Sequence, residues 1–274
     1  MIFFLKNIRL RGLSARVVTA LFGLPLIYIT LRLGNPLLGL VVVAVGSIAA
    51  FEAYTVLKNI GHRLTPWFFV LCAAIIVFSG MNSLSSVILC ILIALGLIIL
   101  ESSFKNNNFL PSRSTLQSAL LLAYVSVPLA LFTLLSNGLY GFDWAFIALA
   151  SVFMTDSCAY FFGRIFGRHQ MAPSISPSKT WEGALGGTFA GIATALILIF
   201  TTAIPWDLMA ASLLAVLIVV FAQIGDIFVS KLKRMANLKD SGRIIFGHGG
   251  VLDRLDSLLP VFVLIYCAAI NWPE

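Results

Sequence analysis

Long apolar runs separated by short polar stretches make up most of this 274-residue chain. A helix that crosses a bilayer needs about 20 mostly apolar residues, and nine segments approach that length. Only Gly34-Asn35-Pro36 separates the first two segments, which predicts a tight helical hairpin. The pattern therefore predicts an all-α polytopic membrane protein with about nine transmembrane helices. The segments lie at roughly 16–33, 36–57, 66–80, 84–101, 115–136, 143–163, 182–203, 206–230 and 251–272.

Composition agrees with a membrane domain. The chain is 60% hydrophobic and only 11% charged, whereas a soluble domain carries about a quarter of charged residues. It shows no long linker, low-complexity tract or clear internal repeat, so we expect a single integral-membrane domain over residues 1–274. Cys72, Cys90, Cys158 and Cys267 lie in apolar runs without metal-ligand spacing, and we interpret them as small packing residues.

The positive charges predict the orientation. If the N-terminus is cytoplasmic, alternate loops place 17 of the 18 lysines and arginines on the cytoplasmic side. Arg32 is the exception, at a helix end where it can snorkel. Nine spans leave the C-terminus outside. The net charge of +7 follows from this topology and from attraction to anionic lipid, so we expect no nucleic-acid partner.

The N-terminal cations are followed by an apolar run without a small-residue cleavage site. This favours a first transmembrane helix over a cleaved signal peptide. The cations are Lys6, Arg9, Arg11 and Arg16.

The stretch Ser230–Ser257 concentrates charge in an otherwise apolar chain, which marks a functional site. Carboxylates bind hard divalent cations, lysines and arginines bind phosphate, and glycines let backbone amides approach an anion. The stretch reads SKLKRMANLKDSGRIIFGHGGVLDRLDS. Its basic residues are Lys231, Lys233, Arg234, Lys239, Arg243 and Arg254, and its acids are Asp240, Asp253 and Asp256.

Three acids suggest a metal site at the cytoplasmic boundary. Asp226 lies near the end of the eighth segment, and Asp253 and Asp256 share one helix face at the start of the ninth. Carboxylates from two neighbouring helices can hold Mg²⁺ and leave positions for phosphate. A single acid there would more readily be explained by pairing with Arg254 or Lys231. Three acids beside the glycine-rich segment 247–250 favour a metal site instead.

Two further segments suit phosphate, and each has a structural alternative. Gly247-His248-Gly249-Gly250 precedes a helix N-terminus, where His248 would be a hydrogen-bond donor, but such glycines also form plain turns. Ser176–Thr180 offers hydroxyls and Lys179, or else caps the next helix with Ser178 or Thr180. Gly186, Gly187 and Gly191 predict close helix packing in the seventh segment.

Two acids inside apolar runs have less certain roles. Asp156 stands at helical spacing with Tyr160 and Arg164 and could face the site. We interpret Glu52 as paired with a nearby cation.

Together these residues resemble the phosphatidate cytidylyltransferase family, also called CDP-diacylglycerol synthases. The family's motif S-x-x-K-R-x4-K-D-S-G, then G-H-G-G-x-x-D-R-x-D, matches Ser230 to Asp256. D-S-x-A-Y-x-x-G-R from Asp156 and S-P-x-K-T-x-E-G from Ser176 also agree, as do Arg16–Leu21 and Pro25. The motif-bearing core is 156–257, while the general pattern covers the chain.

The resemblance implies the reaction CTP + phosphatidate → CDP-diacylglycerol + diphosphate in phospholipid biosynthesis. It implies Mg²⁺, with a second cation such as K⁺ and a homodimer left open, and a bacterial inner membrane with the site facing the cytoplasm. Implied catalytic residues are Asp226, Lys239, Asp253 and Asp256, of which the three aspartates are also metal ligands. Implied substrate-binding residues are Arg164, Ser176, Lys179, Ser230, Lys233, Arg234, Asp240, Ser241, His248, Gly249, Gly250 and Arg254.

The chain departs from the family pattern at two positions. Val229 stands where the family usually has an acid, which predicts a lower metal affinity that Val229→Glu would restore. Phe246 replaces a proline before the glycine-histidine pair, which removes a stiffening residue from the loop.

Two other functions remain as alternatives. A CDP-alcohol phosphotransferase also uses aspartates on helices, but its D-G-x2-A-R-x8-G-x3-D-x3-D pattern is absent from this sequence. A transporter would place its charges near the middle of the membrane, whereas we expect them here at one boundary.

Overall fold

The computed structural model describes residues 23, 25–62, 64–106, 112–202, 204, 207–242 and 249–271. Residues 25–33 are helical. Then follow α2 (Leu37–Asn59), α3 (Pro66–Ser79), α4 (Leu84–Asn106), α5 (Arg113–Leu135), α6 (Gly141–Phe166), β1 (Gln170–Ala172), β2 (Ser176–Thr180), α7 (Trp181–Thr201), α8 (Leu208–Met235), α9 (Leu252–Leu255) and α10 (Leu258–Ile270). Each apolar segment of the sequence thus coincides with helix, and the start of the first lies outside the described residues.

The all-α polytopic prediction is confirmed. Within the described residues, six helices are long and apolar enough to cross a membrane, namely α2, α4, α5, α6, α7 and α8. The helices α3 and α10 are apolar but shorter. Large apolar side chains such as Phe189 and Leu92 face outward, as expected for a surface in contact with lipid.

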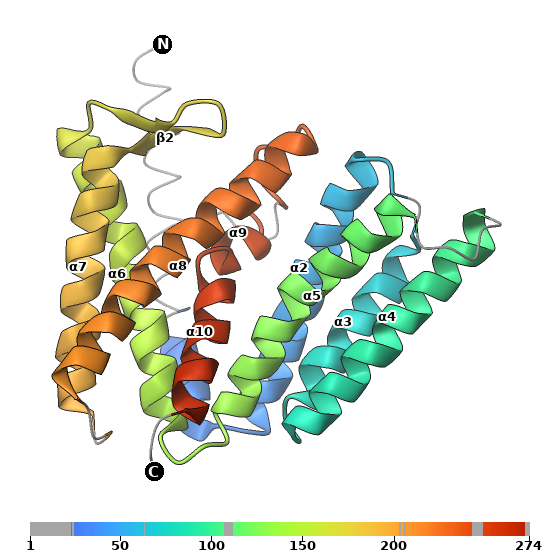
Figure 1. The fold of residues 1–274 in the computed structure, drawn as a ribbon, viewed down its shortest axis with the longest axis horizontal. Coiled ribbons are helices and arrows are strands. Elements are labelled where there is room, and N and C mark those ends of the chain that lie inside the picture. Colours follow the sequence, from blue (N-terminus) through green and yellow to red (C-terminus); the bar gives the residue numbers. More distant parts are fainter. Residues whose placement is uncertain are drawn as a thin grey trace.

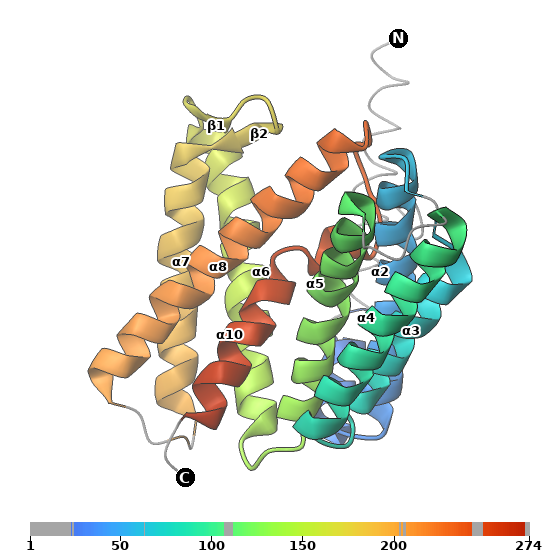
Figure 2. The ribbon, with the colours of Figure 1, turned by 45° about the vertical axis from the view of Figure 1, so that its right-hand side comes forward.

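The helices form two groups joined by α10. Helices α2 to α5 pack together on one side, and α6, α7 and α8 on the other (Figure 1). Helix α10 contacts α5, α6 and α8 and lies between the groups in both views (Figure 2). The buried core runs through both groups, with Phe69, Leu129, Ile218 and Leu259 almost fully enclosed.

Glycines bring α6 and α7 into close contact, as the sequence predicts. A Cβ atom at Gly187 would lie 2.6 Å from the carbonyl oxygen of Thr155, and one at Gly183 would lie 2.6 Å from that of Ala159. At Gly191 a Cβ would collide with the Thr155 hydroxyl. The backbones can approach because these positions carry no side chain.

A β-hairpin connects α6 to α7 at one end of the molecule (Figure 2). The strands β1 and β2 are antiparallel. Thr180 is the N-cap of α7, since its hydroxyl accepts a hydrogen bond from the Gly183 amide at 3.2 Å. Glu182 in the first turn accepts hydrogen bonds from the amides of Arg168 and His169. The capping interpretation of Thr180 is therefore confirmed, and it fixes the hairpin to the helix.

The last apolar segment is interrupted, which differs from the continuous span expected at 251–272. The hydrogen-bonded helix stops after Leu255 and resumes at Leu258. Pro260 has no N–H to donate to the Asp256 carbonyl four residues earlier. Gly225 of α8 approaches this point so closely that a Cβ there would collide with the Asp256 carbonyl oxygen.

The interruption shortens the last helix of the bundle. Helix α10 has 13 residues, and so spans about 20 Å, whereas the hydrocarbon core is about 30 Å thick. In Figure 1 α10 occupies only the lower part of the bundle. Helix α10 alone is therefore too short to cross the hydrocarbon core.

Candidate active site

Three carboxylates come together where α6, α8 and the α9–α10 turn meet. Asp156 is on α6, Asp226 on α8 and Asp256 in the turn. The Ser257 hydroxyl lies 3.5 Å from an oxygen of Asp156 and 3.5 Å from an oxygen of Asp256, and the charge of Asp226 acts on both. We call Asp156, Asp226 and Asp256 the acid cluster.

A lysine from the hairpin reaches this cluster. Lys179 of β2 places its Nζ 2.6 Å from Oδ2 of Asp226, and Ser230, one turn further along α8, lies 3.5 Å from the other oxygen. The whole of α7 separates Lys179 from Asp226 in the sequence, so the tertiary fold and not local spacing makes this pair. An ammonium group at Asp226 offsets part of the repulsion among three acids.

Asp253 has different neighbours from the acid cluster. Its Oδ1 accepts from Lys233 Nζ at 2.6 Å, and its Oδ2 accepts from the amides of Ser241 and Gly250 at 2.9 and 3.0 Å. Burial opposes the charged form, but the bonds from Lys233 and the Gly250 amide prevail and lower the pKa of the Asp253 carboxyl. Both oxygens are engaged in holding the loop before α9.

Glu52 holds the same loop from the opposite side. This α2 side chain is only 2% exposed. It accepts hydrogen bonds from the Ser241 hydroxyl at 2.7 Å and from the amides of Val251 and Leu252 at 3.0 and 2.9 Å. Its described contacts are thus hydroxyl and amide donors, and the pairing with a cation expected from the sequence is not among them. Sequence reasoning missed this role because the partners are about 190 to 200 residues away.

The glycines of the loop make these contacts sterically possible. Gly249 has φ +78°, a left-handed conformation that side chains rarely adopt. A Cβ at Gly242 or Gly250 would collide with the Glu52 carboxylate. We define the Glu52–Asp253 clamp as these two carboxylates together with Ser241 and the amides of residues 250–252. His248, predicted to contact substrate, lies outside the described residues, as do Arg243 and Phe246.

The remaining predicted substrate-binding residues lie on α6, the hairpin, α8, the loop after α8 and α9. Arg234 of α8 donates from Nε to the Ile175 carbonyl at 2.8 Å and so ties the helix to the hairpin turn. Arg164 contacts the Tyr160 hydroxyl at 3.0 Å on the exposed face of α6. The side chains of Ser176 and Ser178 lie 3.4 Å apart. Lys239, Asp240 and Arg254 are exposed. These groups are available to a ligand from water, whereas the clamp is not.

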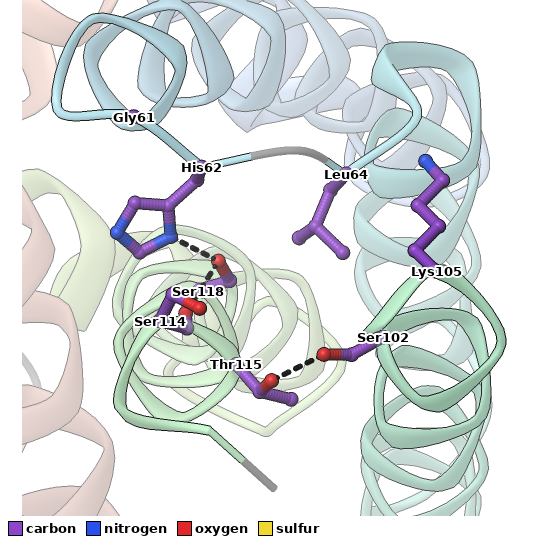
Figure 3. A pocket seen from close by; sticks show the side chains of 8 residues that line it. All are labelled: Gly61, His62, Leu64, Ser102, Lys105, Ser114, Thr115 and Ser118. Atoms are coloured by element: carbon purple, nitrogen blue, oxygen red, sulfur yellow. Dashed lines mark hydrogen bonds between the residues drawn. The ribbon is translucent and has the colours of Figure 1, made fainter. Parts of the chain in front are cut away.

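A polar cavity elsewhere is not part of this arrangement. It measures about 160 Å³ and is bounded by the ends of α2, α4 and α5 (Figure 3). His62 bonds to Ser118 and Ser102 bonds to Thr115, so the polar groups satisfy one another. Burial lowers the pKa of His62 and so favours the neutral imidazole. None of the acid-cluster residues lines this cavity, and we do not assign substrate to it.

Val229 faces a small cavity rather than solvent. It is 1% exposed and lines the cavity together with Tyr124, Leu121 and Lys233. A carboxylate introduced here would stand four residues before Lys233 on the same helix face.

We expect Val229→Glu to draw Lys233 away from Asp253 and to lower turnover. The Mg²⁺ concentration for half-maximal activity should stay the same, because the new charge would be used by Lys233. The measurement is an Mg²⁺ titration of activity for both proteins. A lower half-saturating concentration in the variant would support the original expectation that this position serves the metal.

Comparison with known proteins identifies the family. Residues 14–270 match the cytidylyltransferase family. The chain is similar to a phosphatidate cytidylyltransferase of Staphylococcus haemolyticus, with 32% identity over 92% of this chain and 97% of the relative. It is 33% identical to one from Brucella suis over 93% and 92% of the two chains, and 41% identical to one from Bacillus subtilis over 46% and 47%. The comparisons favour neither a CDP-alcohol phosphotransferase nor a transporter. The chain therefore belongs to the cytidylyltransferase family.

Proposed function

We propose that this protein transfers the cytidylyl group of CTP to phosphatidate, which yields CDP-diacylglycerol and diphosphate. The observation that carries the proposal is the acid cluster with Lys179, set inside a membrane domain beside a loop rich in cations. Relatives named for this activity match the chain over nearly its whole length.

The reaction asks mainly for positioning and charge neutralisation. An oxygen of the phosphatidate phosphate forms a bond to the α-phosphorus of CTP, and the bond from that phosphorus to the β-phosphate oxygen breaks. The electron pair leaves with diphosphate. Such phosphoryl-type transfers need in-line alignment and stabilised negative charge, with little covalent chemistry by the protein.

We propose that the acid cluster binds a divalent cation, Mg²⁺, together with the substrates. Magnesium is commonly held by one or two carboxylates together with substrate phosphates. Among the described residues no three histidine, cysteine or acidic side chains have full metal-site spacing, so phosphate oxygens would complete the coordination. When bound, the cation would neutralise phosphate charge. We propose Asp226 and Asp256 as ligands, as expected from the sequence, and Asp156 rather than Asp253 as the third acid.

The cations would bind the anionic groups of the substrates. Lys179 already lies at the cluster, and Lys239 and Arg254 are exposed. Arg234 holds the hairpin turn, which positions Lys179 on β2. We propose that Lys179 and Lys239 stabilise the negative charge that develops on the leaving diphosphate.

The Glu52–Asp253 clamp would give the glycine loop its shape. Asp253 and Lys233 were expected to act on metal and substrate directly. Because Lys233 and both Asp253 oxygens bond within the protein, we propose that they position the loop instead.

The test is cytidylyl transfer by purified protein in detergent with labelled CTP and phosphatidate. CDP-diacylglycerol and diphosphate should form in equal amounts. A transporter would need a sealed vesicle, so turnover in detergent separates the two classes. Failure to form either product would contradict the proposed function.

We propose that the hairpin faces the cytoplasm of a bacterial inner membrane. The hairpin, the ends of α6 and α8, and the glycine loop carry most of the cations that the topology places inside. The loops at Asn35, Met81 and Asn137 lie together at the opposite end, since Asn137 contacts both of the others.

Cysteine labelling should report this orientation. In a background without the four native cysteines, Leu139→Cys should react with an impermeant maleimide on intact cells, since Leu139 is an exposed residue between α5 and α6. Ser174→Cys, in the hairpin turn, should react only in inverted vesicles. Labelling of Ser174→Cys on intact cells would contradict the orientation.

A further inference from the structure

Tyr124 places a buried hydroxyl beside the acid cluster without a partner. The residue is on α5, and its OH has no hydrogen bond within the part of the chain that the structure describes. A buried hydroxyl left unpaired costs about 1–3 kcal/mol, so such a group usually has a partner in the working protein. Neither the motifs nor the acid cluster accounts for it.

The surroundings of Tyr124 fix where the ring lies. Its ring packs on Phe228 of α8, with centroids 4.8 Å apart. The phenol is within electrostatic range of Asp256 and Asp226. Phe228 is two residues from Asp226, so the contact holds the tyrosine at the level of α8 that carries the cluster.

A structural water is a poor partner for this hydroxyl. The adjoining cavity is only about 10 Å³, which is at the lower limit for one water molecule. Its walls are mostly aliphatic, from Val56, Leu121, Val229 and Leu252. A buried water typically needs about three hydrogen bonds, and the surface that lines this cavity is apolar.

We propose that Tyr124 is a substrate-binding residue whose hydroxyl donates a hydrogen bond to a phosphate oxygen of the substrates held at the acid cluster. The proposal rests on the cytidylyl-transfer function. Phosphate supplies the acceptor that the described part of the protein does not. Lipid and nucleotide phosphates share this acceptor chemistry and both meet at the proposed site, so the experiment has one arm for each.

The variant Tyr124→Phe removes the hydroxyl and leaves the ring on Phe228. We expect kcat/KM to fall by about 10- to 100-fold, the scale of a hydrogen bond to a charged group. The thermal midpoint should stay equal or rise, because an unpaired buried group is removed. Varying CTP and phosphatidate separately shows which KM changes and hence which phosphate accepts the bond.

The matched control is Tyr54→Phe. The Tyr54 hydroxyl donates to the Leu64 carbonyl at 3.1 Å, within the protein. We expect this variant to lose thermal stability and to keep its kcat/KM. If Tyr124→Phe behaves likewise, or keeps wild-type kcat/KM at any stability, the inference is overturned. Absence of turnover by the wild-type protein would instead contradict the proposed function.

Discussion

Replacing Asp226 with asparagine should lower cytidylyl transfer by about 100-fold or more, the scale of one lost preorganised electrostatic contact. The carboxylate lies in the acid cluster and pairs with Lys179 at 2.6 Å. Asparagine keeps the size and polarity but removes the charge that a divalent cation requires. Folding should survive, because the side chain is about one-third exposed and fills no core position. The half-saturating Mg²⁺ concentration should rise in the same variant.

The control for this variant lies on the same helix. Asp207 caps the N-terminus of α8 through the amides of Met209 and Ala210, at the opposite end from Asp226. Asp207→Asn should leave turnover unchanged. Asp253→Asn offers a second comparison: turnover should fall, but the Mg²⁺ requirement should not change, because Asp253 bonds to Lys233 and the loop. Near-normal turnover by a folded Asp226→Asn protein would show that this carboxylate is structural.

Replacing Glu52 with glutamine should lower activity by about 10- to 100-fold, as is common when a group that orients an active site is lost. The amide has one acceptor oxygen where the carboxylate has two, so the Ser241 hydroxyl and the amides of Val251 and Leu252 can no longer all be satisfied. A buried donor left unpaired costs about 1–3 kcal/mol, and the thermal midpoint should fall as well. Activity against CTP concentration and thermal unfolding are the measurements.

Stability loss alone must be separated from a loss of loop geometry. Glu101→Gln is the matched control, since Glu101 also accepts a backbone bond, from Thr65 at 2.7 Å, and pairs with Lys105 at 2.8 Å. We expect Glu101→Gln to lower the thermal midpoint and to keep the wild-type KM for CTP. If Glu52→Gln also keeps that KM and its kcat, the clamp serves stability only.

The sequence predicts the helices well because their signal is local. An apolar run long enough for a bilayer has few alternatives to helix, and even the short segment at 66–80 became α3. The interruption at Asp256-Ser257 was not predicted, although Pro260 is its local cause. The packing of this turn against α8 depends on Gly225, which lets the two backbones approach closely, and this is a tertiary contact.

The acids show where sequence reasoning about the site stops. Asp226 and Asp256 could be selected from motif and spacing, and they lie together with Asp156. Asp253 has the same motif signal, yet its neighbours are Lys233 and two amides, because it reaches back to the loop before α9. Glu52 gave only the signal of an acid in an apolar run. Its donors are the Ser241 hydroxyl and the amides of Val251 and Leu252, all far along the chain, and the residue type at a position does not show which carboxylate its backbone amide will bond.

The close glycine packing between α6 and α7 limits which amino-acid substitutions these two helices can accept during evolution. Gly183, Gly187 and Gly191 sit against the other helix with no room for a methyl group, while Leu185 and Phe189 on the same helix point outward. One side of α7 can therefore exchange its apolar residues freely, and the other cannot change without moving α6. Since α6 carries Asp156 and the hairpin between the helices carries Lys179, a substitution on that side that moved α6 would also displace residues of the proposed site.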